Sequence, residues 1–124
     1  MGIISTRVHG YVDYTMGLLL IVAPYLFGFA TGGPKQWLPI VLGLAAIGYS
    51  LLTRYELGVV RMIPMPAHLG LDVASGALLA VSPWLFGFAD EVFWPHLILG
   101  LVAIGTAAMT QTRPSTETRQ AARR

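Results

Sequence analysis

An internal duplication narrows the range of folds open to this chain. Residues 22–30 read VAPYLFGFA, and residues 81–89 read VSPWLFGFA. Upstream of this segment the two copies match at an offset of 59 residues, and from Trp37 and Trp94 onward they match at an offset of 57. A change in length is tolerated best in a loop. Each copy is therefore predicted to consist of one segment, a short loop and a second segment.

Four apolar stretches coincide with these four segments. Residues 14–31, 36–53, 73–89 and 92–112 contain no Asp, Glu, Lys or Arg, and the chain as a whole is 55% hydrophobic and 11% charged. A helix of about 17–25 apolar residues spans the hydrocarbon core of a bilayer. Membrane-spanning strands would instead alternate apolar and polar residues. The sequence therefore predicts four transmembrane helices.

The proline positions help to set the expected helix bounds. The first helix is expected over residues 8–29, with a kink or an early end near Pro24. The second is expected to carry Pro39 in its first turn and to end near residue 53. The third repeats the first, with Pro83 as its break, and the fourth is expected over residues 94–112.

The predicted fold class is an all-α membrane protein built from two tandem helical hairpins in a single membrane domain over residues 1–124. The expected parts are repeat 1 (8–53), a cytoplasmic linker (54–66), repeat 2 (67–110) and a disordered tail (113–124). Each copy crosses the membrane twice and returns to its starting side. The copies should therefore be related by a pseudo-twofold axis along the membrane normal, unlike the inverted repeats of many transporters.

Basic residues predict the orientation. One side of the predicted bundle carries most of them, namely Arg7, Arg54, Arg61, Arg113, Arg119, Arg123 and Arg124. The other side carries Lys35 together with Asp90 and Glu91. The positive-inside rule predicts that both termini are cytoplasmic in a multi-pass protein of the cytoplasmic (inner) membrane. Anionic lipid accounts for the basic residues, so the bilayer is the expected partner and nucleic acid is not.

Two His/Asp pairs are the candidate functional residues. His9 and Asp13 recur as His68 and Asp72, and a spacing of four places each pair on one helical face. Two interpretations stay open. In the structural one, each Asp lies in the first helical turn near the water boundary, and His ties it to a neighbouring helix. In the functional one, the pairs form a proton, metal or ligand site, because ionisable groups are costly inside a membrane.

Specific cofactor chemistry has little support in the sequence. Two His and two Asp could supply the ligands of a metal site, but spacing alone does not bring the pairs together, so no metal and no cofactor is predicted. A bis-histidine haem has no motif to support it. His96 has no counterpart in the first copy and is expected to be solvated at the outer interface.

Small residues favour close helix packing. Gly43, Ala46 and Ser50 recur as Gly100, Ala103 and Ala107. Such stripes pack the bundle internally or form a face for a second protomer or another protein. No nucleophile with a base, phosphate-binding glycine loop or HExxH motif is present, so the chain is not expected to be an enzyme.

The segment Ser82-Pro83-Trp84, followed by LFGF, resembles the SPW repeat family of small bacterial and archaeal membrane proteins. The first copy departs from this motif, with Pro24 and Tyr25 after an alanine, so proline and an aromatic ring are the shared elements. Aromatic rings at helix ends are typical of the membrane interface. The motif is therefore interpreted as a helix-end device. The resemblance implies no activity.

The function predicted from these features is that of a non-enzymatic scaffold or accessory subunit, as a homo-oligomer or within a larger membrane complex. The alternative is proton or ion permeation, or ligand or metal binding, through His9, Asp13, His68 and Asp72.

Overall fold

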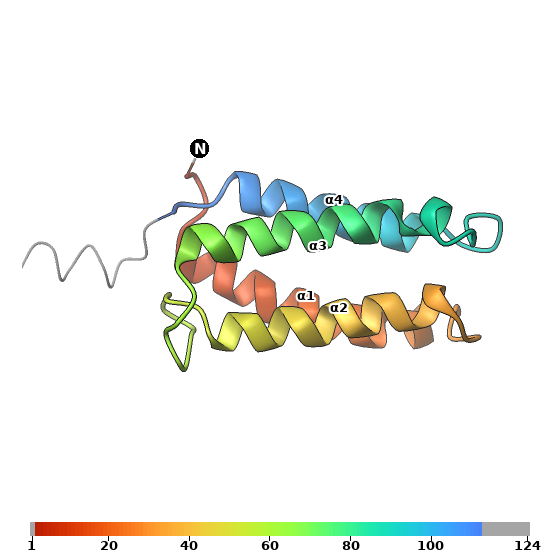
Figure 1. Ribbon diagram of the computed structural model, residues 1–124, viewed down its shortest axis with the longest axis horizontal. Coiled ribbons are helices and arrows are strands. Elements are labelled where there is room, and N and C mark those ends of the chain that lie inside the picture. Colours follow the sequence, from red (N-terminus) through yellow and green to blue (C-terminus); the bar gives the residue numbers. More distant parts are fainter. Residues whose placement is uncertain (1, 113–124) are drawn as a thin grey trace, which may run out of the picture.

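Four helices form the described part of the chain. They are α1 (Thr6–Leu26), α2 (Pro34–Leu51), α3 (Met65–Leu85) and α4 (Trp94–Ala108), arranged as two antiparallel hairpins (Figure 1). The structure is a computed structural model that describes residues 2–112. Over residues 2–112 the regular secondary structure consists of these helices, and two isolated bridges join pairs of extended residues outside them. The tail predicted to be disordered, residues 113–124, lies outside the described residues.

The repeated proline and LFGF segment ends the first helix of each hairpin. Gly28 and Gly87 adopt positive φ angles of 78° and 76°, which favour glycine. The Phe29 N–H donates to the Pro24 carbonyl at 2.8 Å, and the Phe88 N–H donates to the Pro83 carbonyl at 2.8 Å. A left-handed glycine followed by this bond is a Schellman cap. Because the glycine fixes the cap, α1 ends at Leu26 and not at the expected residue 29.

The second helices also differ from expectation. α2 begins at Pro34, so Pro34 takes the first position and Pro39 falls in the second turn and not the first. α2 and α4 end at Leu51 and Ala108, before the expected residues 53 and 112. These helices end early because Thr53 and Thr110 leave them to bridge Ile63 and Ile4.

Glycines bring the two helices of each hairpin into backbone contact. A Cβ atom at Gly43 would lie 2.6 Å from the Gly17 carbonyl oxygen, and one at Gly100 would lie 2.5 Å from the Gly76 carbonyl oxygen. Since neither distance is compatible with a real side chain, α1 packs directly on α2 and α3 on α4. For these two glycines the prediction of packing within the chain is confirmed.

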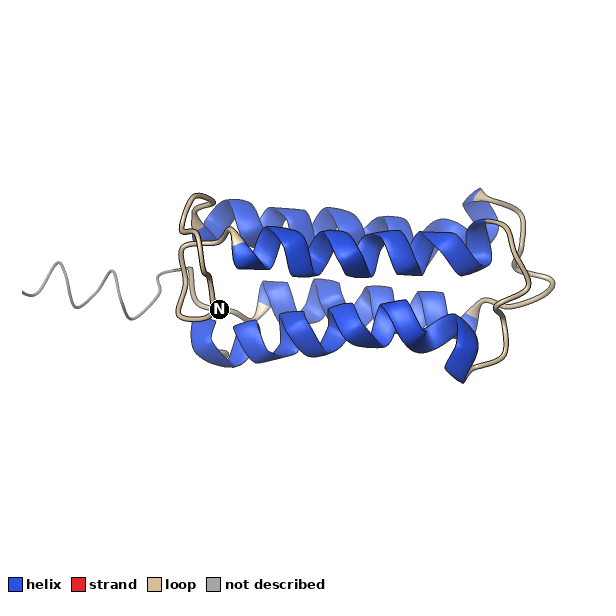
Figure 2. Cartoon of the chain, turned by 90° about the horizontal axis from the view of Figure 1, so that it is seen from below, coloured by secondary structure: helices blue, strands red, loops and turns tan. Residues whose placement is uncertain are grey.

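The two hairpins lie side by side along their length (Figure 2) and touch mainly through α2 and α3. The segments before α1 and α3 cross between hairpins. Ile4 bridges Thr110 at the end of α4, and Ile63 bridges Thr53 at the end of α2. Each hairpin therefore holds the entry segment of the other.

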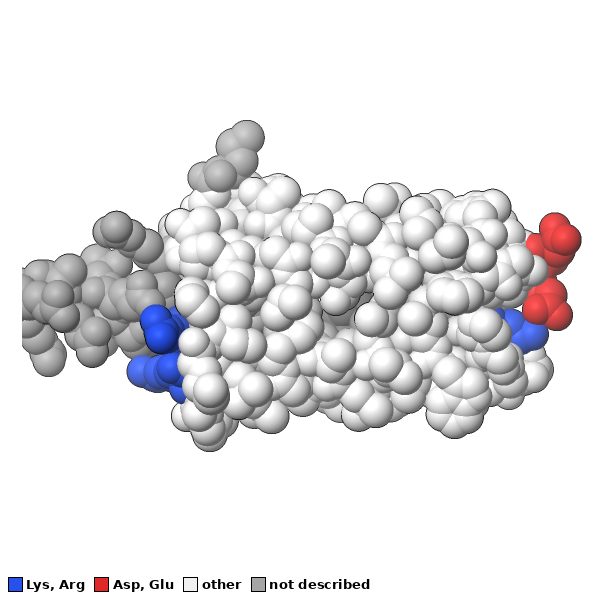
Figure 3. All heavy atoms as spheres, in the orientation of Figure 1, with Lys and Arg blue, Asp and Glu red and all other residues white. Residues whose placement is uncertain are grey.

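On the face seen in Figure 3, the Lys, Arg, Asp and Glu side chains lie at the two ends of the bundle. At the end opposite the N-terminus, Lys35 binds Glu91 with 2.8 Å between Nζ and Oε2. Among the described residues, one helix, α3, is both long and apolar enough to cross a membrane, and α4 is apolar but has 15 residues. The predicted all-helical fold is confirmed over residues 2–112.

Candidate functional site

The four predicted polar residues occupy matching helical positions. His9 and His68 are the fourth residues of α1 and α3, and Asp13 and Asp72 are the eighth. The carboxylates therefore lie beyond the first turn, and the prediction that the helix N-terminus holds them there was wrong. α1 begins at Thr6, two residues before the expected Val8, and the Ser5 side chain caps its first turn, so Asp13 lies still deeper in the helix.

All four side chains are buried. The exposed fractions are 1% for His9, 7% for Asp13, 0% for His68 and 7% for Asp72. Water therefore has little access to the carboxylates, contrary to the expectation that Asp13 lies near the boundary. A buried carboxylate is stable only when it is paired and hydrogen-bonded.

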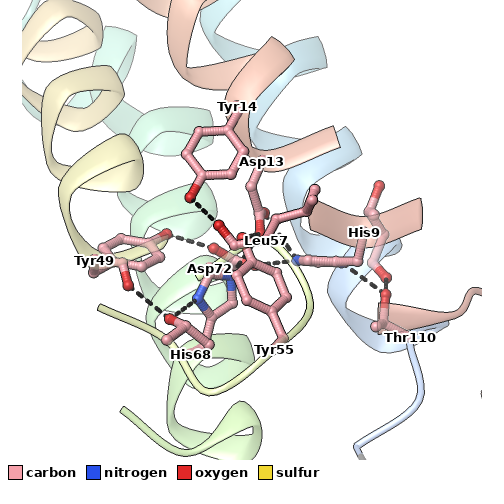
Figure 4. A network of polar contacts seen from close by, with 11 residues as sticks. His9, Asp13, Tyr14, Tyr49, Tyr55, Leu57, His68, Asp72 and Thr110 are labelled. Carbon is pink, nitrogen blue, oxygen red and sulfur yellow. Dashed lines mark hydrogen bonds and ion pairs between the residues drawn. The ribbon is translucent and has the colours of Figure 1, made fainter. Parts of the chain in front are cut away.

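The pairing runs between the hairpins as well as along each helix. His9 Nε2 lies 2.7 Å from Asp72 Oδ2, and His68 Nε2 lies 2.8 Å from Asp13 Oδ2. Within the helices, His9 Nε2 lies 2.9 Å from Asp13 Oδ1, and His68 Nε2 lies 3.3 Å from Asp72 Oδ2. The side chains point toward one another in Figure 4. Each carboxylate thus contacts both imidazoles, as the interpretation of His as a tie to a neighbouring helix requires.

A threonine hydroxyl orients each imidazole by contacting its Nδ1 atom, on the side of the ring away from the carboxylates. His9 Nδ1 lies 2.8 Å from Thr110 Oγ1, and His68 Nδ1 lies 2.7 Å from Thr53 Oγ1. Each threonine hydroxyl donates its one proton to a backbone carbonyl, Thr110 to Thr106 and Thr53 to Tyr49. The hydroxyl oxygen is then left to accept from the imidazole, so both Nδ1 atoms carry a proton and both Nε2 atoms face the carboxylates.

Two tyrosines complete the carboxylate bonding. The Tyr55 hydroxyl donates to Asp13 Oδ2 at 2.8 Å, and the Tyr49 hydroxyl donates to Asp72 Oδ1. Tyr55 lies in the connection between α2 and α3 and has an exposed fraction of 0%. Burial and the nearby Asp13 carboxylate raise the pKa of the Tyr55 phenol well above its usual value. The phenol therefore stays a neutral donor.

The connection that carries Tyr55 is anchored on α1. Thr6 donates from its hydroxyl to Glu56 Oε1 at 2.7 Å, and the Tyr14 hydroxyl donates to the Leu57 carbonyl at 2.7 Å. Tyr55 packs with Met65, Leu69 and Ala107 in a small apolar core. This segment closes the end of the bundle over the His/Asp cluster, by which we mean His9, Asp13, His68 and Asp72.

One buried nitrogen of the cluster lacks a hydrogen bond. His68 Nε2 lies near both carboxylates, yet neither oxygen is aligned to accept from it. One ligand atom from each of the four residues lies within 4.8 Å of the others. Two imidazole nitrogens and two carboxylates make a donor set that a divalent metal ion can use.

A cavity of about 40 Å³ lies between the hairpins next to the cluster. Its polar end is formed by His9, Asp13, Tyr49, Asp72 and Ser75. The remainder is apolar, with side chains such as Leu20, Leu79 and Leu99. Since a water molecule needs roughly 10–15 Å³ of such volume, the whole cavity has room for about three waters.

The repeated motif residues lie far along the helices from the cluster. Ser82, Pro83, Trp84, Pro24 and Tyr25 belong to the C-terminal turns of α3 and α1, whereas the cluster lies in their N-terminal halves. Ser82 is buried and donates to the Leu79 carbonyl at 2.7 Å within its own helix. Trp84 and Tyr25 are more than half exposed. These residues form a helix end and not a polar site.

His96 is buried, and the expectation that it is solvated was wrong. Its exposed fraction is 1%, and its Nε2 donates to the Lys35 carbonyl of the other hairpin at 2.8 Å. The rings of Phe29 and Phe88 flank it, with centroids at 4.9 Å and 4.8 Å. His96 therefore links the hairpins at the end opposite the cluster.

The family comparison gives a match to the SPW repeat domain over residues 7–110. The chain belongs to the SPW repeat family. Comparison with curated proteins and with solved structures gave no match. SPW repeat membership supports a small membrane protein and brings no activity with it. The matched range includes the His/Asp cluster as well as the motif after which the SPW repeat is named.

Sequence reasoning missed four residues of the site in this SPW repeat protein: Thr53, Thr110, Tyr49 and Tyr55. The two threonines had a signal, because they match at the offset of 57 just as the histidines match at 59. The tyrosines had none. Tyr49 and Tyr55 align with Thr106 and Thr112 in the second copy, so no repetition draws attention to them.

Proposed function

We propose that the protein is a non-enzymatic membrane scaffold or accessory subunit of four spans, with both termini cytoplasmic. The observation that carries this proposal is the placement of the His/Asp cluster. Its contacts join the two hairpins, and the outward surface that remains is apolar along the helices. The buried contacts of the His/Asp cluster thus join the two hairpins into one rigid block. A rigid apolar block is suited to lie among lipids and other membrane-embedded helices.

Helix length and charge placement support four spans. The helices have 21, 18, 21 and 15 residues. At about 1.5 Å per residue they are roughly 22–32 Å long, close to the hydrocarbon thickness of a bilayer. Arg7 lies in the first turn of α1, and Arg54 and Arg61 lie in the α2–α3 connection, all on one side. The pairing of α1 with α2 and of α3 with α4 fits a pseudo-twofold axis along the membrane normal.

Cysteine labelling tests the orientation, because the natural chain has no cysteine. Val59→Cys places a thiol in the α2–α3 connection, and Asp90→Cys places one in the α3–α4 connection. In intact cells a membrane-impermeant maleimide should label the variant at 90 and should label the variant at 59 only after lysis. Labelling of both positions in intact cells, or the reverse pattern, would exclude the proposed topology.

The non-enzymatic character is supported by how the hydroxyl groups are used. Thr53 and Thr110 lie beside histidines, but each hydroxyl donates to a backbone carbonyl and not to the imidazole. An activated nucleophile needs the opposite arrangement, in which the hydroxyl donates to its base. The burial of both threonines also keeps substrates away from them.

The outer faces of α2 and α4 are the proposed contact surface for a second copy or another membrane protein. Gly48 and Gly105 occupy matching positions, and a Cβ at either would meet nothing within 4 Å. Small residues that face outward let another helix approach closely. This surface is separate from the glycines at 17, 43, 76 and 100, which are used inside the hairpins.

Cross-linking in native membranes tests this surface. Ala45→Cys lies on the exposed face of α2, and Leu18→Cys on the exposed face of α1 is the matched control. A short bifunctional thiol reagent should give a discrete cross-linked species from position 45, either with a second copy or with another chain, and little from position 18. If both variants stay monomeric, and the untagged protein purifies alone and monomeric in mild detergent, the scaffold proposal fails.

A further inference from the structure

We propose that His9, Asp13, His68 and Asp72 form a binding site for one divalent transition-metal ion, with two imidazole nitrogens and two carboxylate oxygens as ligands. The site goes beyond the scaffold proposal, because a scaffold requires only that the four residues hold the hairpins together.

The spacing of the donor atoms suits a tetrahedral ion. Zn²⁺ binds imidazole nitrogen and carboxylate oxygen at about 2.0–2.2 Å, which places neighbouring ligand atoms of a tetrahedron about 3.3–3.5 Å apart. The four Nε2-to-oxygen distances in the cluster are 2.7, 2.8, 2.9 and 3.3 Å. These distances run to both oxygens of Asp13, and with one donor atom from each residue the four atoms lie within 4.8 Å of one another. An ion therefore requires the closest donors to move apart by a few tenths of an ångström and the most widely spaced donors to approach each other. Calcium and magnesium are disfavoured because they prefer six or more oxygen ligands.

The histidines already have the support that metal ligands need. A ligating imidazole usually donates its other N–H to an oxygen, which fixes the tautomer and the ring orientation. Thr110 and Thr53 accept from the Nδ1 atoms of His9 and His68 in this way, and their own protons go to backbone carbonyls. Metal binding would release the Nε2 proton that faces the carboxylates, and both Nε2 lone pairs would then be directed toward the centre of the cluster.

His68 Nε2 gives an independent indication of a ligand. The atom is fully buried and lies 2.8 Å and 3.3 Å from carboxylate oxygens, but it makes no aligned hydrogen bond to either. A buried nitrogen of this kind needs a partner. An ion between the four side chains would supply one along the direction of the lone pair.

A divalent ion also fits the charge of the cluster. Over residues 2–112, neither Asp13 nor Asp72 has a Lys or Arg within ion-pair distance. The tyrosine hydroxyls orient the carboxylates without neutralising them. Their charge partners are His9 and His68, which balance the two carboxylates when both imidazoles are protonated. A single divalent cation gives the same balance when both imidazoles are neutral ligands, and buried carboxylates are stable when they coordinate a metal.

The first test is metal content. The full chain, purified in detergent through a tag that contains no histidine, is stripped with a chelator and equilibrated with Zn²⁺ or Co²⁺. Elemental analysis should find one ion per chain, and Co²⁺ should show the intense visible absorption of tetrahedral coordination. Less than about a tenth of an equivalent of either metal, in a protein that is folded by circular dichroism, would overturn the proposal.

Variants then place the ion. His68→Gln should abolish binding, and His96→Gln, which removes the buried histidine at the opposite end, should keep one ion per chain. If His68→Gln does not fold, the metal affinity of Thr53→Val is measured instead. Thr53 accepts a hydrogen bond from His68 Nδ1, and loss of such a hydrogen-bond partner of a metal ligand typically weakens metal affinity about 10- to 100-fold. Unchanged affinity in Thr53→Val, or equal loss in His68→Gln and His96→Gln, would show that the ion does not bind at the cluster. The cross-linking test of the scaffold proposal does not involve these variants, so its result is independent of whether the cluster binds a metal.

Discussion

His9 of α1 holds Asp72 of α3 across the boundary between the two hairpins, with 2.7 Å between Nε2 and Oδ2. The reciprocal contact joins His68 to Asp13 at 2.8 Å. Each repeat therefore supplies the acid for the histidine of the other repeat. One copy alone would keep only the contact between His and Asp along its own helix and would lose both contacts across the boundary, so the buried cluster is complete only with two copies.

Replacing one acid of the cluster should destabilise the bundle strongly. Asp72→Asn removes a charge that both histidines face, and breaking a buried ion pair typically costs about 3–5 kcal/mol. Thermal unfolding in detergent, followed by circular dichroism, should show a clear fall in Tm. Asp90→Asn changes an exposed acid in the α3–α4 connection and is the matched control. Equal Tm values for the two variants would argue against the contacts between Asp72 and the two histidines.

The threonines should contribute equally, because they occupy matching positions. Thr53→Val and Thr110→Val each leave a buried Nδ1–H without an acceptor. Such a loss costs about 1–3 kcal/mol. Denaturant titration of both variants should give similar losses of unfolding free energy. A large loss for one and none for the other would show that the two halves of the site are not equivalent.

Glycine substitutions should separate internal packing from the outer surface. Gly43→Ala places a Cβ 2.6 Å from the Gly17 carbonyl oxygen, so α1 and α2 must move apart. Overpacking of this kind costs about 1–3 kcal/mol. Gly48→Ala meets nothing within 4 Å, and alanine in a helix is favoured over glycine by about 0.5–1 kcal/mol. The Tm should fall for the first variant and hold or rise for the second, and the reverse order would contradict the packing.

The serine and tryptophan of the repeated motif should be dispensable. Ser82 donates only to the Leu79 carbonyl of its own helix, and Trp84 is 56% exposed. The double change Ser82→Ala and Trp84→Tyr gives the second copy the residues that the first copy has at Ala23 and Tyr25. Unfolding free energy should change by about 0.5 kcal/mol or less, as for ordinary substitutions away from key contacts. A loss of several kcal/mol would mean that the motif has a role beyond ending the helix.

The repeat made much of the fold predictable. It predicted two hairpins, the place of each loop and the matching positions of the two His/Asp pairs in their helices. The helix ends were less predictable, because they depend on contacts between segments far apart in the chain. Thr53 and Thr110 leave their helices to bridge Ile63 and Ile4, and no local pattern marks that exchange.

The site was predictable only where the repeat marked it. His9, Asp13, His68 and Asp72 stood out because they recur, but Tyr49 and Tyr55 do not recur and were missed. His96 was misplaced for a related reason. A histidine near a helix start in an apolar chain is readily assigned to the solvated interface, and its burial depends on Phe29, Phe88 and the Lys35 carbonyl, which only the folded chain brings together.

A double-mutant cycle between His9 and Asp72 tests most directly whether the cluster joins the hairpins. The unfolding free energy is measured for the natural chain, His9→Gln, Asp72→Asn and the double variant. Residues in direct contact show coupling energies of about 0.5–3 kcal/mol, and a buried pair at 2.7 Å should lie in the upper part of that range. Losses that simply add, with no coupling energy, would contradict the account.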